Sequence, residues 1–417
     1  MIYEAIIIGG GAAGLFCAIE AGKRGRKVLV IEHNAEVGRK IVISGGGRCN
    51  FTNLHTRPEN FISQNPHFCK SALSRYTPQD FVELVKKHKI AYYEKKLGQL
   101  FCRESSRQIV DMLLSECRAA RAEIKMGCTV AKISKNEHFL VETDHGKCKA
   151  KNVVVACGGL SFPKIGASDL GYRIARQFKL KIVETRPSLV ALVLEGKNYS
   201  QLAGVSIDSV VTAGKQSFRE NILFTHRGLS GPAVLQISNY WKRGESISIH
   251  VAPEIDLMKQ LTGNRGSRRN LGNFLGEFLP QRLADEFAMS EAENKPLYQL
   301  NSGEVESLGK KLIDWRLRFR ETEGYGRAEV TLGGVSTDEL SSQTMETKKV
   351  PGLYFIGEVV DVTGWWAGII FNGRGPRHMP PAVLFKIKRG KRLPHRLPLF
   401  PRRIQGVCKT RKLLHLS

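Results

Sequence analysis

The chain alternates runs of consecutive apolar residues with stretches in which apolar positions recur every three to four residues. Residues 6–8 and 28–31 are apolar at every position, which is typical of parallel strands buried on both faces. Residues 15–23, between these runs, have helical character. The order strand, helix, strand predicts an α/β fold class, and we expect a Rossmann-like domain with a parallel sheet and a small sheet lying over it.

Three glycines occupy the turn between the first strand and the helix, in the pattern G-x-G-x-x-G. Gly9 permits the tight turn, Gly11 lets a pyrophosphate approach the backbone, and Gly14 lets the helix pack close to the strand. The N-terminal N–H groups of the helix point toward the phosphates. We therefore predict that a dinucleotide contacts Gly9, Gly11, Ala12, Ala13 and Gly14.

Glu32 stands at the end of the second strand, where it can accept hydrogen bonds from ribose hydroxyls. No arginine is placed to meet a 2′-phosphate, which favours FAD or NAD over NADP. Two later segments favour FAD, because this long cofactor needs contacts at both ends. Each is a buried strand that ends in glycine or acid, and together they add Gly158, Gly159, Gly357, Glu358 and Asp361 to the cofactor-binding candidates.

A third glycine-rich segment, residues 44–53, suits a backbone that lies flat against a flavin or a pyrophosphate. A cation at Lys40 or Arg48 would stabilise an anionic reduced flavin. Cys49 has no second cysteine nearby in sequence, so a packing role is favoured over a redox role. This segment adds Lys40, Gly45, Gly46, Gly47, Arg48 and Asn50 to the cofactor-binding candidates, and Arg48 and Cys49 are also candidate catalytic residues.

The chain resembles the YhiN/BaiN-like bacterial flavoproteins, which are also described as aminoacetone-oxidase-type or NAD(P)/FAD-dependent oxidoreductases. The sequences SGGGRCNFTN at 44–53 and LFTHRGLSGPAVLQIS at 223–238 are specific to that family. The resemblance implies an inserted domain and a contact between Val130 and the adenine. The matching stretches are 6–14, 38–53, 156–171, 187–192, 223–238, 328–336 and 344–364.

The domain boundaries follow from a change of pattern near residue 194, after which strand-like runs are followed by helical ones. We expect a discontinuous FAD-binding domain at 1–193 and 343–365 and an inserted β-rich and helical domain at 194–342. Within the insert, His226 is a candidate proton donor, although a loop histidine that bonds backbone is the more ordinary interpretation.

The net charge of +25 is unevenly distributed over the 417 residues. Residues 366–417 hold 13 Lys and Arg, six prolines and no acid, which leaves 51 basic and 39 acidic residues in the rest. Such a tail is expected to be disordered. A basic arm for nucleic acid or lipid is one interpretation, but a back-translation shifted by one nucleotide gives GGYNFQWAWAS, the loop with which the family continues. We therefore expect a frameshift after Trp365, in the gene or in its sequencing.

Nine cysteines without C-x-x-C pairs or His/Cys clusters at metal spacing fit a reducing cytoplasm, and we expect no metal site. The absence of a signal-like start and of long apolar runs predicts no export and no membrane partner. No second G-x-G-x-x-G follows a strand, so NAD(P)H would have to visit the substrate pocket.

The leading functional hypothesis is an FAD-dependent oxidoreductase that transfers a hydride between flavin N5 and a small organic substrate. The resemblance allows reduction of a conjugated enone or oxidation of a small amine. On this hypothesis a nucleic acid partner is not expected. The alternatives are an FAD-dependent tRNA-modifying protein, suggested by the basic body, and a flavin-binding protein without catalysis.

Overall fold

The computed structural model describes residues 1–197, 199–372 and 383–388. A parallel sheet forms the core of the N-terminal part, and the predicted runs at 6–8 and 28–31 lie side by side in it, fully buried. This arrangement confirms the predicted α/β fold class. The parallel strands, in order across the sheet, are β7 (Glu123–Lys125), β2 (Val28–Ile31), β1 (Ile2–Ile8), β10 (Gly146–Val155) and β19 (Leu353–Phe355).

The long strand β10 belongs to two pairings. Its first half pairs antiparallel with β9 (Phe139–Thr143), which in turn pairs with β8 (Val130–Lys135), while its second half lies between β1 and β19. Helix α1 packs so closely on α5 that a Cβ at Gly22 would lie 2.3 Å from the Ala120 carbonyl oxygen. The helices of this part are α1 (Ala12–Lys23), α2 (Arg39–Ile43), α3 (Lys70–Arg75), α4 (Pro78–Lys87), α5 (Arg107–Ala119) and α6 (Leu170–Gln177).

Smaller sheets flank this core and connect distant parts of the chain. One has three antiparallel strands in the order β3 (Asn50–Asn53), β6 (Gln99–Cys102) and β5 (Tyr92–Glu94). Two more are pairs that bring late residues back onto the N-terminal part: β4 (Phe61–Ile62) with β20 (Thr363–Gly364), and β11 (Ile182–Ser188) with β18 (Val330–Val335).

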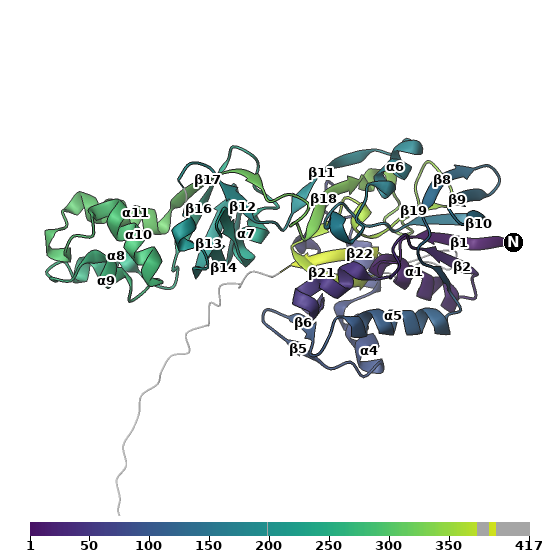
Figure 1. Ribbon diagram of the computed structural model, residues 1–417, viewed down its shortest axis with the longest axis horizontal. Coiled ribbons are helices and arrows are strands. Elements are labelled where there is room, and N and C mark those ends of the chain that lie inside the picture. Colours follow the sequence, from purple (N-terminus) through teal and green to yellow (C-terminus); the bar gives the residue numbers. More distant parts are fainter. Residues whose placement is uncertain (198, 373–382, 389–417) are drawn as a thin grey trace, which may run out of the picture.

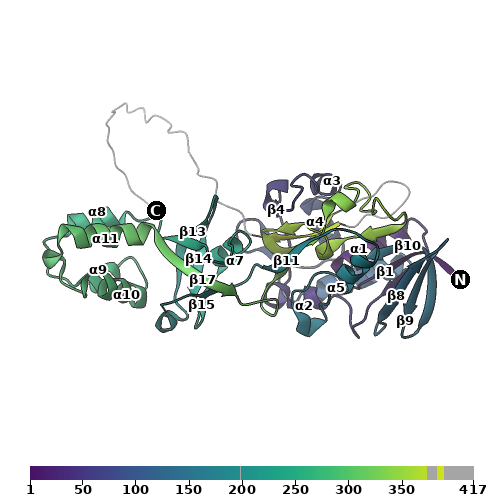
Figure 2. The ribbon, with the colours of Figure 1, turned by 90° about the horizontal axis from the view of Figure 1, so that it is seen from above.

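The middle of the chain forms a closed barrel and a group of helices. In Figure 1 the barrel lies between helices α8–α11 and the parallel sheet, with α7 on the side of the barrel that faces the sheet, and Figure 2 shows the same order from above. The barrel strands, in order, are β12 (Leu192–Leu194), β15 (Gly228–Ser230), β14 (Gln216–Phe224), β13 (Ser206–Ala213), β16 (Ser246–Val251) and β17 (Trp315–Thr322). The helices are α7 (Pro232–Ile237), α8 (Leu257–Gly263), α9 (Leu271–Leu275), α10 (Gln281–Ala292) and α11 (Ser302–Ile313).

Two separate hydrophobic cores hold these parts together. One joins residues 3–182 with residues 335–362, and the other joins residues 192–319. The predicted boundaries at 193/194 and 342/343 fall near this division and stay a prediction. Among the described residues, no helix is both long and apolar enough to cross a bilayer.

Three local details of the structure bear on the sequence pattern. Residues 270–287 have a helical pattern, but the structure interrupts it with a turn at residues 276–280, which ends in Pro280 and separates α9 from α10. Two serines, Ser105 and Ser106, are candidate caps for α5: Ser105 Oγ accepts from the Arg107 backbone N–H at 3.2 Å, whereas the Ser106 hydroxyl donates to the Val42 carbonyl. Disorder over 366–417 does not hold for β21 (Trp366–Asn372) and β22 (Val383–Lys388), which pair antiparallel, while residues 373–382 and 389–417 lie outside the described residues.

Candidate dinucleotide-binding site

A cavity of about 450 Å³ opens at the carboxyl ends of β1, β2 and β10. Ligands of doubly wound sheets bind at this edge, because the loops that follow the strands converge there. The cavity brings together most of the predicted cofactor-binding residues. Those that line it are Gly9, Gly11, Ala12, Ala13, Glu32, Lys40, Gly45, Gly46, Asn50, Val130, Gly158, Gly159, Gly357 and Glu358.

The glycines of the first turn have the spatial properties that their predicted roles require. A Cβ at Gly14 would lie 1.9 Å from the Gly9 carbonyl oxygen, so only glycine lets α1 start this close to β1. Gly9 has a φ of +111°, which a residue with a side chain rarely adopts. A Cβ at Gly11 would meet no protein atom within 4 Å, so the space above it is open to the cavity.

Glu32 lies at the end of β2 with only 6% of its surface exposed. Its Oε2 accepts a hydrogen bond from the Gly10 backbone N–H at 2.7 Å, and its Oε1 accepts one from the Asn34 backbone N–H at 2.9 Å. These donors fix the carboxylate at the cavity wall, where it retains lone pairs for further donors. Val130 and Cys128, at the start of β8, line the same end of the cavity.

Residues 44–47 form an irregular turn, and Ser44, Gly45 and Gly46 in it line the cavity. Gly45 and Gly46 have φ values of +58° and +66°, in the left-handed region that favours glycine. A Cβ at Gly45 would lie 2.8 Å from the ring of Phe101, whereas a Cβ at Gly46 would meet nothing within 4 Å. The turn therefore packs on β6 through Gly45 and presents open backbone at Gly46.

At this cavity an ion pair joins an early residue of the chain, Lys40, to a late one, Glu358. The Lys40 ammonium group donates to Glu358 Oε2 at 2.8 Å, and Glu358 Oε1 accepts from the Thr331 backbone N–H at 2.9 Å. Gly159 is required beside this pair, because a Cβ there would lie 2.4 Å from Thr331 Oγ1. The carboxylate of Glu358 is thus held in place, and the Lys40 side chain is fixed beside it at the cavity wall.

Gly14, Gly47, Arg48 and Asp361 are the predicted cofactor-binding residues that do not line the cavity. Arg48 is exposed and donates to the Arg103 carbonyl. Asp361 is 3% exposed and accepts from the Gln64 backbone N–H at 3.0 Å, away from the cavity wall. Burial, partly offset by this hydrogen bond, raises the pKa of Asp361 to about 6.

The candidate catalytic residues Cys49 and His226 also lie outside the cavity lining, as Arg48 does. The Cys49 side chain is fully buried, and burial raises the pKa of its thiol to about 12, so it is protonated at neutral pH. His226 is exposed in the turn between β14 and β15. The packing role favoured for Cys49 therefore fits its surroundings.

The structure adds lining residues that sequence reasoning missed. Lys95, Gln99 and Phe101 come from the β5–β6 hairpin, while Pro232 and Leu235 come from α7 of the inserted part. No motif marks these positions, because they reach the cavity only when the three-stranded sheet and the barrel pack beside the glycine turn. The additional acids that line this cavity are Glu36 and Glu329.

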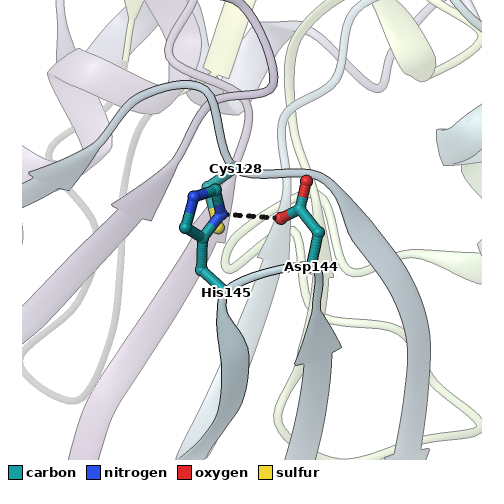
Figure 3. A group of neighbouring side chains, drawn as sticks. All are labelled: Cys128, Asp144 and His145. Atoms are coloured by element: carbon teal, nitrogen blue, oxygen red, sulfur yellow. Dashed lines mark hydrogen bonds and ion pairs between the residues drawn. The ribbon is translucent and has the colours of Figure 1, made fainter.

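Cys128, Asp144 and His145 lie close together (Figure 3), with their potential ligand atoms within 4.8 Å of one another, and Cys128 also lines the cavity. This group could not be predicted from the sequence, because its residues are not spaced as metal ligands. Asp144 Oδ1 already accepts from the Thr129 backbone N–H at 2.8 Å and contacts His145 Nδ1 at 2.9 Å. These bonds close the turn between the strands and account for the arrangement without a metal ion.

Comparisons with known proteins find relatives that match most of the chain. The ribosomal RNA dihydrouridine synthase of Escherichia coli (strain K12) is 51% identical over 378 residues, which cover 89% of this chain and 94% of that protein. The protein of the same name from Haemophilus influenzae is 44% identical and covers 88% of this chain and 95% of that protein. A 3-dehydro-bile acid delta(4,6)-reductase of Clostridium scindens is 26% identical over 90% of this chain and 99% of that protein.

A family model also matches, over residues 3–373, and its description is HI0933-like protein Rossmann domain. The match includes the glycine turn, the segment at 44–53 and the barrel. The chain therefore belongs to the HI0933-like family, which confirms the resemblance to YhiN/BaiN-like flavoproteins seen in the sequence.

Proposed function

We propose that the protein is an FAD-dependent reductase that converts uridine to dihydrouridine in ribosomal RNA. The observation that carries this proposal is the 51% identity to a ribosomal RNA dihydrouridine synthase across 89% of the chain. This proposal differs from the leading sequence-based hypothesis of a small substrate. It lies close to the alternative of an RNA-modifying flavoprotein, with ribosomal RNA in place of tRNA.

The residues of the cavity fit FAD. The open space above Gly11 and the N-terminus of α1 suit the pyrophosphate, and the carboxylate of Glu32 suits ribose hydroxyls. Gly46 and the Lys40–Glu358 pair, more than 300 residues apart in sequence, line the part of the cavity assigned to the isoalloxazine. When bound, FAD would supply a hydride to a carbon–carbon double bond.

The reaction class follows from chemistry that two relatives share. Dihydrouridine is uridine in which the C5–C6 double bond, conjugated to the C4 carbonyl, has been saturated. A delta(4,6)-reductase of a 3-dehydro-bile acid likewise acts on double bonds conjugated to a carbonyl. Reduction of a conjugated enone is therefore favoured over amine oxidation for this chain.

The chain's own residues orient and shield such a substrate. Phe101 is 6% exposed and Gln99 is 2% exposed, so the wall on the β6 side is closed to bulk water. Lys40 supplies positive charge, which would stabilise negative charge that develops on the substrate carbonyl or in the reduced cofactor. NAD(P)H would enter the same pocket as the reductant, since a second glycine fingerprint is not found in the sequence.

Anaerobic photoreduction of the FAD-loaded full chain tests the proposal. Unmodified ribosomal RNA should reoxidise the flavin, and nucleoside mass spectrometry should detect dihydrouridine in the same sample. Reoxidation by small conjugated enones but not by RNA would assign the chain to small-molecule reduction instead. Reoxidation by neither would favour flavin binding without catalysis and would overturn the proposal.

A further inference from the structure

The family-specific stretch at residues 223–238 is distant in sequence from every cofactor-binding candidate. It forms the end of β14, strand β15 and helix α7, all in the inserted part. Two of its residues, Pro232 and Leu235 of α7, nevertheless line the cavity. Since the contacts expected for FAD come from the other part of the chain, an inserted helix that reaches the cavity is suited to contact the substrate.

Helix α7 has two apolar faces that serve different purposes. Ala233, Val234 and Ile237 are fully buried in the hydrophobic core of the barrel. Pro232 and Leu235 are three positions apart, so they share one side of the helix, and both are half-buried and line the cavity. The second face therefore presents accessible apolar surface to the cavity.

A buried arginine joins the end of α7 to the Glu358 end of the cavity. The Arg186 guanidinium donates to the carbonyl of Asn239 at 2.9 Å and to that of Trp241 at 3.4 Å, just after the helix. Arg186 belongs to β11, which pairs with β18, and Thr331 of β18 donates its backbone N–H to Glu358. The helix is thus connected to the part of the cavity assigned to the isoalloxazine.

The two ends of α7 are also fixed by close packing. Gly231, before the helix, has a φ of +87°, and a Cβ there would lie 2.7 Å from the Leu223 backbone nitrogen, so the helix starts directly against β14. After the helix, the Trp365 indole N–H donates to the Tyr240 hydroxyl at 2.5 Å, and its ring lies edge-on to Phe218 with centroids 5.1 Å apart. A wall held in this way is preorganised for a ligand.

Reduction of a conjugated ring requires a surface of this kind. Such a ring is planar, and hydride transfer to it needs the reacting atoms about 3–3.5 Å apart in a fixed orientation. One face of the ring then lies against the flavin, and the opposite face needs a support that excludes water. An apolar wall suits that face, because it offers contact without competing for the hydrogen bonds of the ring edge.

We propose that α7 is the substrate wall of the cavity: the ring that is reduced lies between the flavin and the face formed by Pro232 and Leu235. Arg186 is the positioning residue that holds α7 in place. The inference rests on the proposed function and adds the surface that receives the ring. The ligand class that it specifies is a planar, conjugated ring, either a uracil base or a free cyclic enone.

The test measures anaerobic reoxidation of the photoreduced, FAD-loaded full chain by unmodified ribosomal RNA and, separately, by a cyclic enone. Leu235→Trp fills the space in front of the wall, so reoxidation by both acceptors should slow by about tenfold or more. FAD affinity and reoxidation by ferricyanide, which accepts single electrons and needs no hydride geometry, should change by less than about twofold.

Leu194→Trp is the matched control. Leu194 is a half-buried leucine on barrel strand β12 that lines a separate cavity. It receives the same added bulk, and the variant should be reoxidised by both acceptors at the parent rate. Leu235→Ala adds no bulk and avoids overpacking; it should raise KM for the enone about fivefold with unchanged FAD affinity, since part of the wall is lost.

Arg186→Met tests the positioning role, because it removes the bonds to both carbonyls and keeps an apolar stem. KM for the enone should rise about fivefold while FAD affinity stays unchanged, and Arg186→Lys, which keeps a cationic donor, should recover part of the loss. A lower unfolding temperature with unchanged KM would show that Arg186 serves stability alone.

The outcomes separate this inference from the proposed function. The wall assignment fails if Leu235→Trp is reoxidised at the parent rate, or if it loses FAD, since α7 would then contact the cofactor instead of the substrate. If the enone reoxidises the parent chain and RNA does not, the proposed function fails, while the variants still test the wall with the enone. A parent chain that neither acceptor reoxidises overturns both.

Discussion

Gly11 and Gly14 lie three residues apart, yet substitutions at the two positions should have opposite consequences. Gly11→Ala should leave thermal stability nearly unchanged, because the added Cβ meets no protein atom within 4 Å, but should weaken FAD binding at least tenfold by filling the pyrophosphate space. Gly14→Ala should instead destabilise the fold, since its Cβ would lie 1.9 Å from a carbonyl oxygen. Thermal unfolding of the apoprotein and FAD titration separate the two effects. Equal FAD affinity for Gly11→Ala and the parent chain would contradict this assignment.

At the residue scale, the sequence identified positions whose roles depend on the local backbone and failed where roles depend on packing. Gly9, Gly11 and Glu32 follow predicted strands, so their places at the sheet edge could be inferred. Arg48 and Cys49 belong to the same motif, but the left-handed backbone at residues 45–47 turns Cys49 into the core and leaves Arg48 in solvent. The direction of a side chain after such a turn does not follow from its spacing in sequence.

At the scale of elements, Glu116 on α5 connects three helices. Its carboxylate pairs with Lys23 of α1 at 2.8 Å, with Lys87 of α4 at 2.7 Å and with His88, which follows α4, at 2.8 Å. Burial alone would raise the pKa of Glu116, but the hydrogen bonds from these partners lower it to about 2. Glu116 therefore stabilises the fold above pH 4.5, and this contribution falls as the pH drops from 4.5 toward 2.

We expect Glu116→Gln to lower the free energy of unfolding by about 2 kcal/mol at pH 7 and by roughly half as much at pH 3. Urea unfolding followed by circular dichroism at both pH values measures this difference. Glu83→Gln is the control, because the Glu83–Lys86 pair on α4 is exposed to solvent and should contribute little to stability at either pH. A loss for Glu116→Gln that is equal at pH 7 and pH 3 would show that the carboxylate charge is not the cause.

The elements themselves could be predicted to different degrees. The parallel strands β1, β2, β10 and β19 are short apolar runs followed by glycine or acid, a local pattern that is visible in sequence. The closed barrel could not be predicted, because β12 pairs with β17, about 125 residues later, and such long-range pairing leaves no local signal. For the same reason the contribution of α7 and the β5–β6 hairpin to the cavity became apparent only from the structure.

At the scale of the whole molecule, the basic tail, residues 366–417, is the segment whose sequence agrees least with the rest of the chain. The family match ends at residue 373, and residues 389–417 lie outside the described residues. We infer that the reading frame shifts after Trp365, as the back-translated loop indicates. Resequencing of the gene and intact mass measurement of the native protein test this inference. An uninterrupted frame and a mass that matches the 417-residue chain would contradict it.

If the shift is present in the organism, the chain lacks the loop with which related proteins continue, and its affinity for FAD should be lower than that of a version with the frame restored. Side-by-side FAD titration of the two versions measures this difference. Equal affinity would show that the residues before Trp366 suffice to hold the cofactor.

The account depends on one cavity that holds a single extended flavin nucleotide between the glycine turn at residues 9–14 and the Lys40–Glu358 pair. The most direct test is to saturate the purified, frame-restored chain with FAD, remove free nucleotide by gel filtration and record the absorption spectrum of the protein fraction. We predict retention of one FAD per chain, with a shifted flavin spectrum, and its loss in Gly11→Ala. A colourless protein fraction without measurable FAD affinity would contradict the account.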